Sequence, residues 1–297
     1  MKSQVIWFTS LLIAPAFAFG MGHGPGSGAA QTLATQSLEI ELPVLSFDGA
    51  VCGKTATRSM GSMSYCMEPG TSSRVLISFP GVFNNEFAYQ RAYPQSLRKA
   101  MKAAGQMPTI FTINLGTVSF LNGHTRKSGR SDVQEVIEAL SKTLVKHGFS
   151  SLSERPGSVD LLGESMGGHN SIMIYLRAPQ LFRNFALMCP ALSRISPFIN
   201  EADWLKSMDE DGEWYRSLSY KSAMQYFFRS QASWDVSSPL WFGIKSYIPL
   251  AQPGAVFVTN VQSDYFGFNS GGREFIKLMK VKGHPVEAHV SAGKEHC

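Results

Sequence analysis

A short motif, Gly163-Glu164-Ser165-Met166-Gly167-Gly168, constrains the fold of this chain more than any other feature. An apolar run at residues 159–162 precedes it, and a helix-like stretch begins near His169. A serine flanked by glycines between a strand and a helix is typical of a sharp, strained turn that raises the hydroxyl into the open. The following helix would offer backbone N–H groups to a developing negative charge. The motif therefore predicts a nucleophilic serine at Ser165. A chance match is the alternative.

Strand-like and helix-like segments alternate around this motif. Apolar strands are expected at residues 74–79, 108–115, 159–162, 185–189, 255–261 and 286–290. Helices are expected between them, and Ser131 with Gln134 forms a capping box at the start of one. This alternation predicts an α/β fold with a mostly parallel central sheet and helices on both faces. With 297 residues, the chain fits one elaborated domain.

The N-terminus has the pattern of an export signal. Residues 1–18 contain Lys2, then an apolar run, then Ala16 and Ala18 in the small-residue pattern of a cleavage site. We expect a signal peptide at 1–18, a Gly/Ala-rich flexible leader at 19–36 and the folded domain at 37–297. A membrane anchor is the alternative, but the apolar run is short and contains Pro15. The chain is therefore predicted to be secreted or periplasmic, without stable membrane insertion.

Two regions depart from the alternation. Residues 37–49 and 63–70 both have strand character, which suggests an N-terminal antiparallel hairpin or meander. Residues 190 to about 250 place many aromatic side chains among helical stretches. This second region indicates an inserted helical cap, which suggests an apolar or aromatic acyl pocket, although aromatic residues in a cap can equally form its own small core.

A serine nucleophile needs a histidine base, and that histidine needs an orienting carboxylate. In folds with this serine turn, the order along the chain is Ser, then Asp or Glu, then His. Asp264 follows the expected strand at 255–261, and His296 follows the last strand. We therefore predict Ser165, Asp264 and His296 as a catalytic triad. A loop-capping role is the alternative for Asp264, and His169 is expected to pack or to support the site.

A second group of residues is expected to stabilise the oxyanion. The loop after the first core strand contains Phe79-Pro80-Gly81-Val82-Phe83. Glycine permits close approach of this backbone to a substrate. We expect the backbone N–H of Val82 or Phe83, together with that of Met166, to form the oxyanion hole. Pro80-Gly81 could equally be a plain turn.

The segments SFPGVF and GESMGGHN, with the Asp264 and His296 loops, resemble the esterase D-like branch of the α/β-hydrolases over residues 74–296. The resemblance implies hydrolysis of carboxylic esters or thioesters through an acyl-enzyme, without a cofactor, on a small-molecule or acylated substrate. An acyltransferase with the same triad, a peptidase of related fold and an inactive binding protein remain alternatives. The sequence departs from the family pattern at Phe79-Pro80-Gly81, at Glu164, and in ending one residue after His296.

The four cysteines suggest two bridges in an exported protein. In this fold the histidine loop leans toward the nucleophile, so we expect Cys189 to pair with Cys297 and Cys52 with Cys66. A buried free thiol at Cys189 is the alternative. The cysteine spacing is not that of a zinc site, and no structural metal is expected.

The net charge of +5 carries little functional information. Basic residues are scattered, except in one loop that contains His124, Arg126, Lys127 and Arg130. Nucleic-acid binding needs a clustered basic stripe, so it is not expected. The loop is interpreted as a solvated surface, with a site for an acidic substrate group as the alternative.

Overall fold

The computed structural model describes residues 49–82, 95–207, 212–293 and 296. These residues belong to one compact unit that begins at Leu42. The predicted signal peptide at 1–18, the leader at 19–36, most of the strand expected at 37–49, Phe83 and Cys297 lie outside the described residues.

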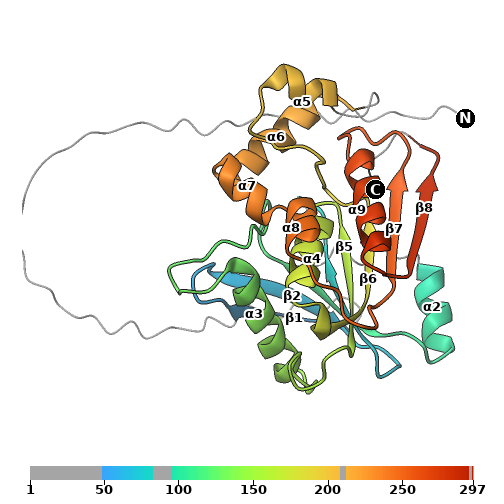
Figure 1. The fold of residues 1–297 in the computed structure, drawn as a ribbon. Coiled ribbons are helices and arrows are strands. Elements are labelled where there is room, and N and C mark those ends of the chain that lie inside the picture. The colour runs from blue at the N-terminus through green and yellow to red at the C-terminus, as the bar shows by residue number, and fades with distance from the viewer. Residues whose placement is uncertain (1–48, 83–94, 208–211, 294–295, 297) are drawn as a thin grey trace, which may run out of the picture. The chain divides into compact units, whose positions relative to one another are not determined.

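The central element is an eight-stranded sheet in the order β1-β2-β4-β3-β5-β6-β7-β8 (Figure 1). Strands β3 to β8 pair in parallel with one another, while β2 pairs antiparallel with both β1 and β4. The bounds are β1 Val51–Ala56, β2 Ser62–Glu68, β3 Val75–Phe79, β4 Thr109–Asn114, β5 Val159–Glu164, β6 Phe182–Met188, β7 Val256–Val261 and β8 Val286–Ser291. The predicted, mostly parallel α/β sheet is confirmed.

Helices cover both faces of the sheet. The main core lies on one face, where α3 Asp132–Lys146, α4 Met166–Arg177, α8 Pro239–Lys245 and α9 Asn269–Val281 pack on alternate strand residues such as Ile77 and Phe111. On the other face, α2 Gln95–Ala103 packs through Met101 against Leu76 and Ile110. Neighbouring strand residues point to opposite faces of a sheet. Ile77 therefore packs in the main core, and Leu76 packs with Met101 of α2 on the other face.

Capping residues mark both ends of α3, and a glycine pair lies near the start of α9. Ser131 and Gln134 form the predicted capping box at the start of α3, and His147 caps its end. A short 3₁₀ helix, Pro179–Leu181, follows α4. Helix α9 begins at Asn269 and contains Gly271 and Gly272, where close packing leaves no room for a side chain. A Cβ atom on Gly271 would lie 2.1 Å from the backbone oxygen of Leu192.

The N-terminal hairpin differs in one partner from the sequence expectation. Strand β2 is where the pattern placed it, but its described hairpin partner is β1, Val51–Ala56, which was not predicted as a strand. Cys52 lies directly opposite Cys66 in this pairing, and the two form a disulfide. Pairing with β2 stabilises β1 more than its own strand propensity does, since Gly53 and Lys54 are poor strand formers.

The chain between β6 and β7 contains four helices in its described part: α5 Glu201–Ser207, α6 Trp214–Phe228, α7 Gln231–Ser237 and α8. Figure 1 shows α5, α6 and α7 beyond the end of the sheet toward which the parallel strands point. Their apolar side chains form a second cluster around Trp204, Met224 and Trp234, separate from the main core. Within the described residues, every helix is too short or too polar to cross a membrane.

Candidate active site

Ser165 occupies a strained turn between β5 and α4. Its φ angle is 50° and its ψ angle is −115°, a backbone conformation that is costly for a residue with a side chain. The turn is held by backbone bonds from Ser165 N to Met188 O (2.9 Å) and from Ala191 N to Ser165 O (2.8 Å). The adjacent strand β6 and the chain that follows it therefore fix the serine in place.

The glycines of the motif are required by close backbone packing. A Cβ atom on Gly167 would lie 2.0 Å from the backbone oxygen of Phe79, and one on Gly163 would lie 2.4 Å from the oxygen of Gly167. Contacts this short do not occur between real atoms. Any larger residue would push α4 away from β3 and β5 and would displace Ser165.

The three residues predicted as a triad are brought together by the fold. Ser165 Oγ lies 2.7 Å from His296 Nε2, and His296 Nδ1 lies 2.7 Å from Asp264 Oδ2. A carboxylate can only accept, so Nδ1 carries the proton that binds Asp264, and Nε2 is left to accept from the serine hydroxyl. The geometry matches a nucleophile, a base and an orienting acid.

Asp264 and His296 are shielded from water. Only 2% of the Asp264 side chain and 8% of the His296 side chain are exposed. The other carboxylate oxygen of Asp264 accepts the backbone N–H of Phe266 at 2.8 Å. The rings of Phe266 and Phe268 lie 5.1 and 5.4 Å from the imidazole, measured between centroids. The residues after β7 therefore supply both the acid and the apolar wall around the base.

The structure describes two of the three residues predicted for the oxyanion hole. Met166 is buried at the first position of α4, where a backbone N–H has no acceptor within the helix. Val82 is partly buried and packs in the same apolar cluster as Met166. Phe83, the other residue predicted for this role, lies outside the described residues.

Glu164 is a second carboxyl group near the imidazole, and sequence reasoning treated it only as a departure from the family pattern. Burial raises the pKa of Glu164, and the charge of His296 opposes that shift. Its position directly before the nucleophile was the available signal. Within the described chain, no hydrogen bond to its carboxylate is found, so no hydrogen-bond donor offsets its burial.

Two further residues of the nucleophile helix support the site. His169 Nε2 lies 3.0 Å from Leu121 O, and the Asn170 side chain binds Leu121 N (2.8 Å) and Ser119 O (2.7 Å). They hold the loop that carries Phe120 against Met166. The supporting role predicted for His169 fits this contact, whereas the role of Asn170 was missed.

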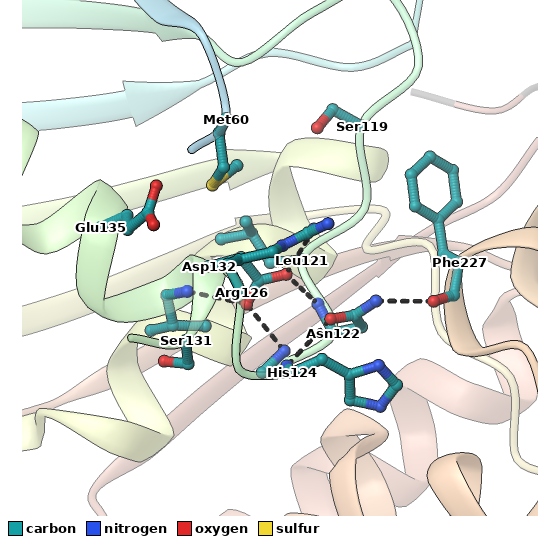
Figure 2. Close-up of polar contacts among 12 residues, drawn as sticks. Met60, Ser119, Leu121, Asn122, His124, Arg126, Ser131, Asp132, Glu135 and Phe227 are labelled. Atoms are coloured by element: carbon teal, nitrogen blue, oxygen red, sulfur yellow. Dashed lines mark hydrogen bonds and ion pairs between the residues drawn. The ribbon is translucent and has the colours of Figure 1, made fainter. Parts of the chain in front are cut away.

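Figure 2 shows polar contacts of the basic loop, in which Asp132 is surrounded by groups from Asn122, His124 and Arg126. The buried carboxylate of Asp132 accepts the backbone N–H groups of Asn122 (2.9 Å) and Gly123 (2.8 Å) and an Arg126 nitrogen (3.3 Å). Asn122 also donates to Phe227 O, at 2.6 Å, and so reaches α6. The loop therefore joins α3 to the helices that follow β6.

Two further side chains of this loop are also engaged. Arg130 pairs with Glu138 at 2.9 Å, and His124 is hydrogen-bonded to Ser233. Burial lowers the pKa of His124. Arg126 and Arg130 are therefore already paired to carboxylates, so most of the positive charge of the loop is not free to bind an acidic substrate group.

A cluster of three potential metal ligands is found in the described part of the chain, namely Cys189, Asp264 and His296, with ligand atoms within 4.8 Å of one another. Cys189 is disulfide-bonded, so no thiolate is available. Asp264 and His296 are bonded to each other. The chemistry of these donors therefore suits a triad beside a disulfide and does not suit a metal.

A cavity of about 230 Å³ lies between α2 and the sheet and is distinct from the triad. Arg74, Leu76, Met101, Ala186 and Phe257 are among the residues that line it. None of the triad residues lines it. The arrangement of polar groups at Ser165 is therefore a better guide to the reaction than this cavity.

Comparison with known proteins agrees with the geometry. A family model described as "Putative esterase" matches residues 63–237. An esterase of Pyrobaculum calidifontis has 15% sequence identity and a TM-score of 0.55, covering 86% of this chain and 78% of its own. A thermostable carboxylesterase from a metagenomic library has 13% identity and a TM-score of 0.55, with coverages of 86% and 81%.

Carboxyl esterase 2 of the fungus Tuber melanosporum has 14% identity and a TM-score of 0.56, with coverages of 83% and 77%. A search of curated proteins found no match. At such identities the structural neighbours establish the α/β-hydrolase fold. The family match spans more than half of the sequence. The chain therefore belongs to this esterase family of the α/β-hydrolase superfamily.

Proposed function

We propose that this protein is a secreted or periplasmic serine carboxylesterase that forms an acyl-enzyme on Ser165. The observation that carries the proposal is the hydrogen-bonded chain from Ser165 Oγ through His296 to Asp264, with both bonds at 2.7 Å. A strained serine turn and an apolar wall around the base support the same role. Membership of an esterase family makes a carboxylic ester the substrate class.

The mechanism begins when Ser165 Oγ attacks the ester carbonyl carbon. The hydroxyl proton passes to His296 Nε2, and Asp264 stabilises the imidazolium that results. The backbone N–H groups of Met166 and of Val82 or Phe83 stabilise the oxyanion. His296 then gives its proton to the departing alcohol oxygen as the C–O bond breaks. Water, activated by the same base, hydrolyses the acyl-serine.

The helices between β6 and β7 act as a cap that contributes the acyl pocket. Phe198, Leu218 and Phe227 are partly buried and pack in the cluster that contains Met166, the residue after the nucleophile. Partly buried apolar side chains beside a nucleophile favour an apolar acyl group, because its surface leaves water on binding.

Export is part of the proposal. Residues 1–18 have the pattern of a cleavable signal, and the Cys52–Cys66 disulfide is compatible with an oxidising compartment. N-terminal sequencing of the exported protein is expected to begin at Phe19. Recovery of the intact N-terminus in the membrane fraction would support the membrane-anchor alternative instead.

The decisive test is Ser165→Ala. We expect turnover of chromogenic acetate and butyrate esters to fall by about 10⁴ or more, because the triad acts as a unit. Thermal stability should change little, since alanine also carries one Cβ atom at this turn. Ser222→Ala, at an exposed position on α6, is the matched control and should retain full activity.

A fluorophosphonate probe should label the wild-type protein at Ser165 and leave the alanine variant unlabelled. Labelling at another serine would refute the assignment, and no labelling or turnover would favour an inactive binding protein. Product analysis with added alcohols separates hydrolysis from acyl transfer.

A further inference from the structure

Strand β8 leaves one edge of the central sheet open. It pairs with β7 and, among the residues that the structure describes, with no other strand (Figure 1). All of its residues except Val286 are exposed, and Val290 is 49% exposed. Proteins usually protect such an edge with lysine, proline or a bulge, because its free backbone groups can pair with another chain. The sequence VEAHVS contains neither lysine nor proline.

The backbone bonds to β7 identify which groups face outward. Val256 N donates to Pro285 O at 2.8 Å, and Gln262 N donates to Ser291 O at 2.9 Å. Alternate residues of a strand direct their N–H and C=O groups to the same side. Glu287 and His289 therefore bond toward β7, whereas Val286, Ala288 and Val290 present both backbone groups to the open edge.

The open edge is complementary to itself. Read in either direction from Ala288, the strand has a polar ionisable residue and then a valine. A two-fold axis at Ala288 would place Val286 opposite Val290 of a second copy, and Glu287 opposite its His289. The three outward residues would form hydrogen-bonded pairs, with about six intermolecular bonds.

The alternation of an antiparallel ladder favours this register. Glu287 and His289 would form the non-hydrogen-bonded pairs, in which side chains lie closest, so that the imidazole can donate to the carboxylate. An axis at Glu287 would oppose two carboxylates, which is unfavourable. An axis at His289 would oppose two imidazoles and leave each carboxylate facing Ser291.

We propose that the β8 edge is a homodimer interface, with two copies paired antiparallel about Ala288 to form one continuous sheet. Phe257, which is 41% exposed and aligned with Glu287 in the neighbouring strand, adds apolar surface beside the charged pair. An isologous contact of this kind closes at two subunits and leaves no further edge of β8 to pair.

The test uses the mature protein in sedimentation velocity over a range of concentrations. Wild type is expected to sediment as a dimer. Ala288→Pro removes an outward N–H donor without touching the bonds to β7, so the variant should fold but dimerise at least about thirtyfold more weakly, since two bonds are lost per dimer. Circular dichroism and thermal unfolding confirm that the variant is folded.

Cysteine pairs test the register. Glu287→Cys and His289→Cys proteins should form a disulfide-linked dimer when mixed under mild oxidation, and each alone should form little. The described native cysteines are already bonded and do not compete. A monomeric wild type, a dimer that survives Ala288→Pro, or self-linking of the Glu287→Cys protein would each overturn the proposal. None of these readouts depends on esterase activity.

Discussion

At the scale of single residues, His169 is held neutral by its surroundings. It is only 1% exposed, its ring meets Phe120 edge-on at 5.1 Å, and Leu121 O accepts from its Nε2 at 3.0 Å. Burial lowers the pKa of His169 to about 4. A buried imidazolium would have to be formed without a counter-charge, so the fold opposes its protonation.

This shift predicts a loss of stability in acid. The unfolded chain takes up the proton near pH 6.5, whereas the folded protein resists until about pH 4. Stability is therefore complete above pH 6.5 and falls as the pH drops through this window. Between pH 7 and pH 5 the free energy of unfolding should decrease by about 2 kcal/mol because of this residue.

Urea denaturation of wild type and His169→Gln at the two pH values measures the effect. Glutamine can still donate to Leu121 O but does not titrate, so its pH dependence should be smaller by about 2 kcal/mol. Burial also lowers the pKa values of three other histidines, His124, His147 and His284. Because these residues are present in both proteins, their contributions to the pH dependence cancel. An equal decrease in both proteins would contradict the prediction.

At the scale of elements, helix α6 connects the proposed cap to the triad. Glu213 N, at its start, donates to Tyr265 O at 2.7 Å, and the Arg216 guanidinium lies 4.1 Å from the Tyr265 ring centroid. Further along, Tyr220 packs edge-on against Phe268 at 4.6 Å. The helix thus rests on the same loop that supplies Asp264 and shields His296.

Substitutions at two neighbouring residues of α6 can distinguish an effect on substrate binding from an effect on helix stability. Phe227 is partly buried, with its ring 5.5 Å from that of Phe120, whereas Tyr226 is 77% exposed. We expect Phe227→Ala to lower kcat/KM for long-chain esters about tenfold more than for an acetate ester, because the remote acyl group loses its contact surface. Tyr226→Ala, the control, should leave the ratio unchanged. Equal losses on both esters would make Phe227 structural.

At the scale of the whole molecule, chain order predicted most of the sheet and the grouping of the candidate site. Parallel strands bring their carboxyl ends to one edge of the sheet. The serine turn, together with the positions of Asp264 and His296 after strands, was therefore sufficient to predict that the three residues lie close together. The burial of individual side chains depends on tertiary packing and could not be predicted from the sequence. Trp204 and Trp234 are buried while Trp214 is 65% exposed, although all three stand in similar aromatic sequence. The strand at β1 depends in the same way on its pairing with β2.

The C-terminal end of the chain is expected to be tied to the site by a second disulfide. Cys189 is buried and disulfide-bonded, and its sulfur lies within 4.8 Å of ligand atoms of Asp264 and His296. The predicted partner, Cys297, lies outside the described residues, so this pairing stays a prediction. A bridge at this point would anchor the residue next to the base, and a misplaced base lowers turnover steeply.

The prediction is that Cys297→Ser lowers turnover of an acetate ester and the melting temperature together. The bridge would close a loop of about 108 residues, for which chain entropy allows at most about 4 to 5 kcal/mol of stabilisation. The Cys52→Ser/Cys66→Ser double variant is the matched control. Its bridge closes a short loop in the β1–β2 hairpin, whose strands are four and three positions from β5 in the sheet, so it should lose stability while turnover at 25 °C is retained. Peptide mapping without reduction identifies the pairing directly. A free thiol at Cys189 or Cys297, or turnover unchanged by Cys297→Ser, would exclude the anchoring role.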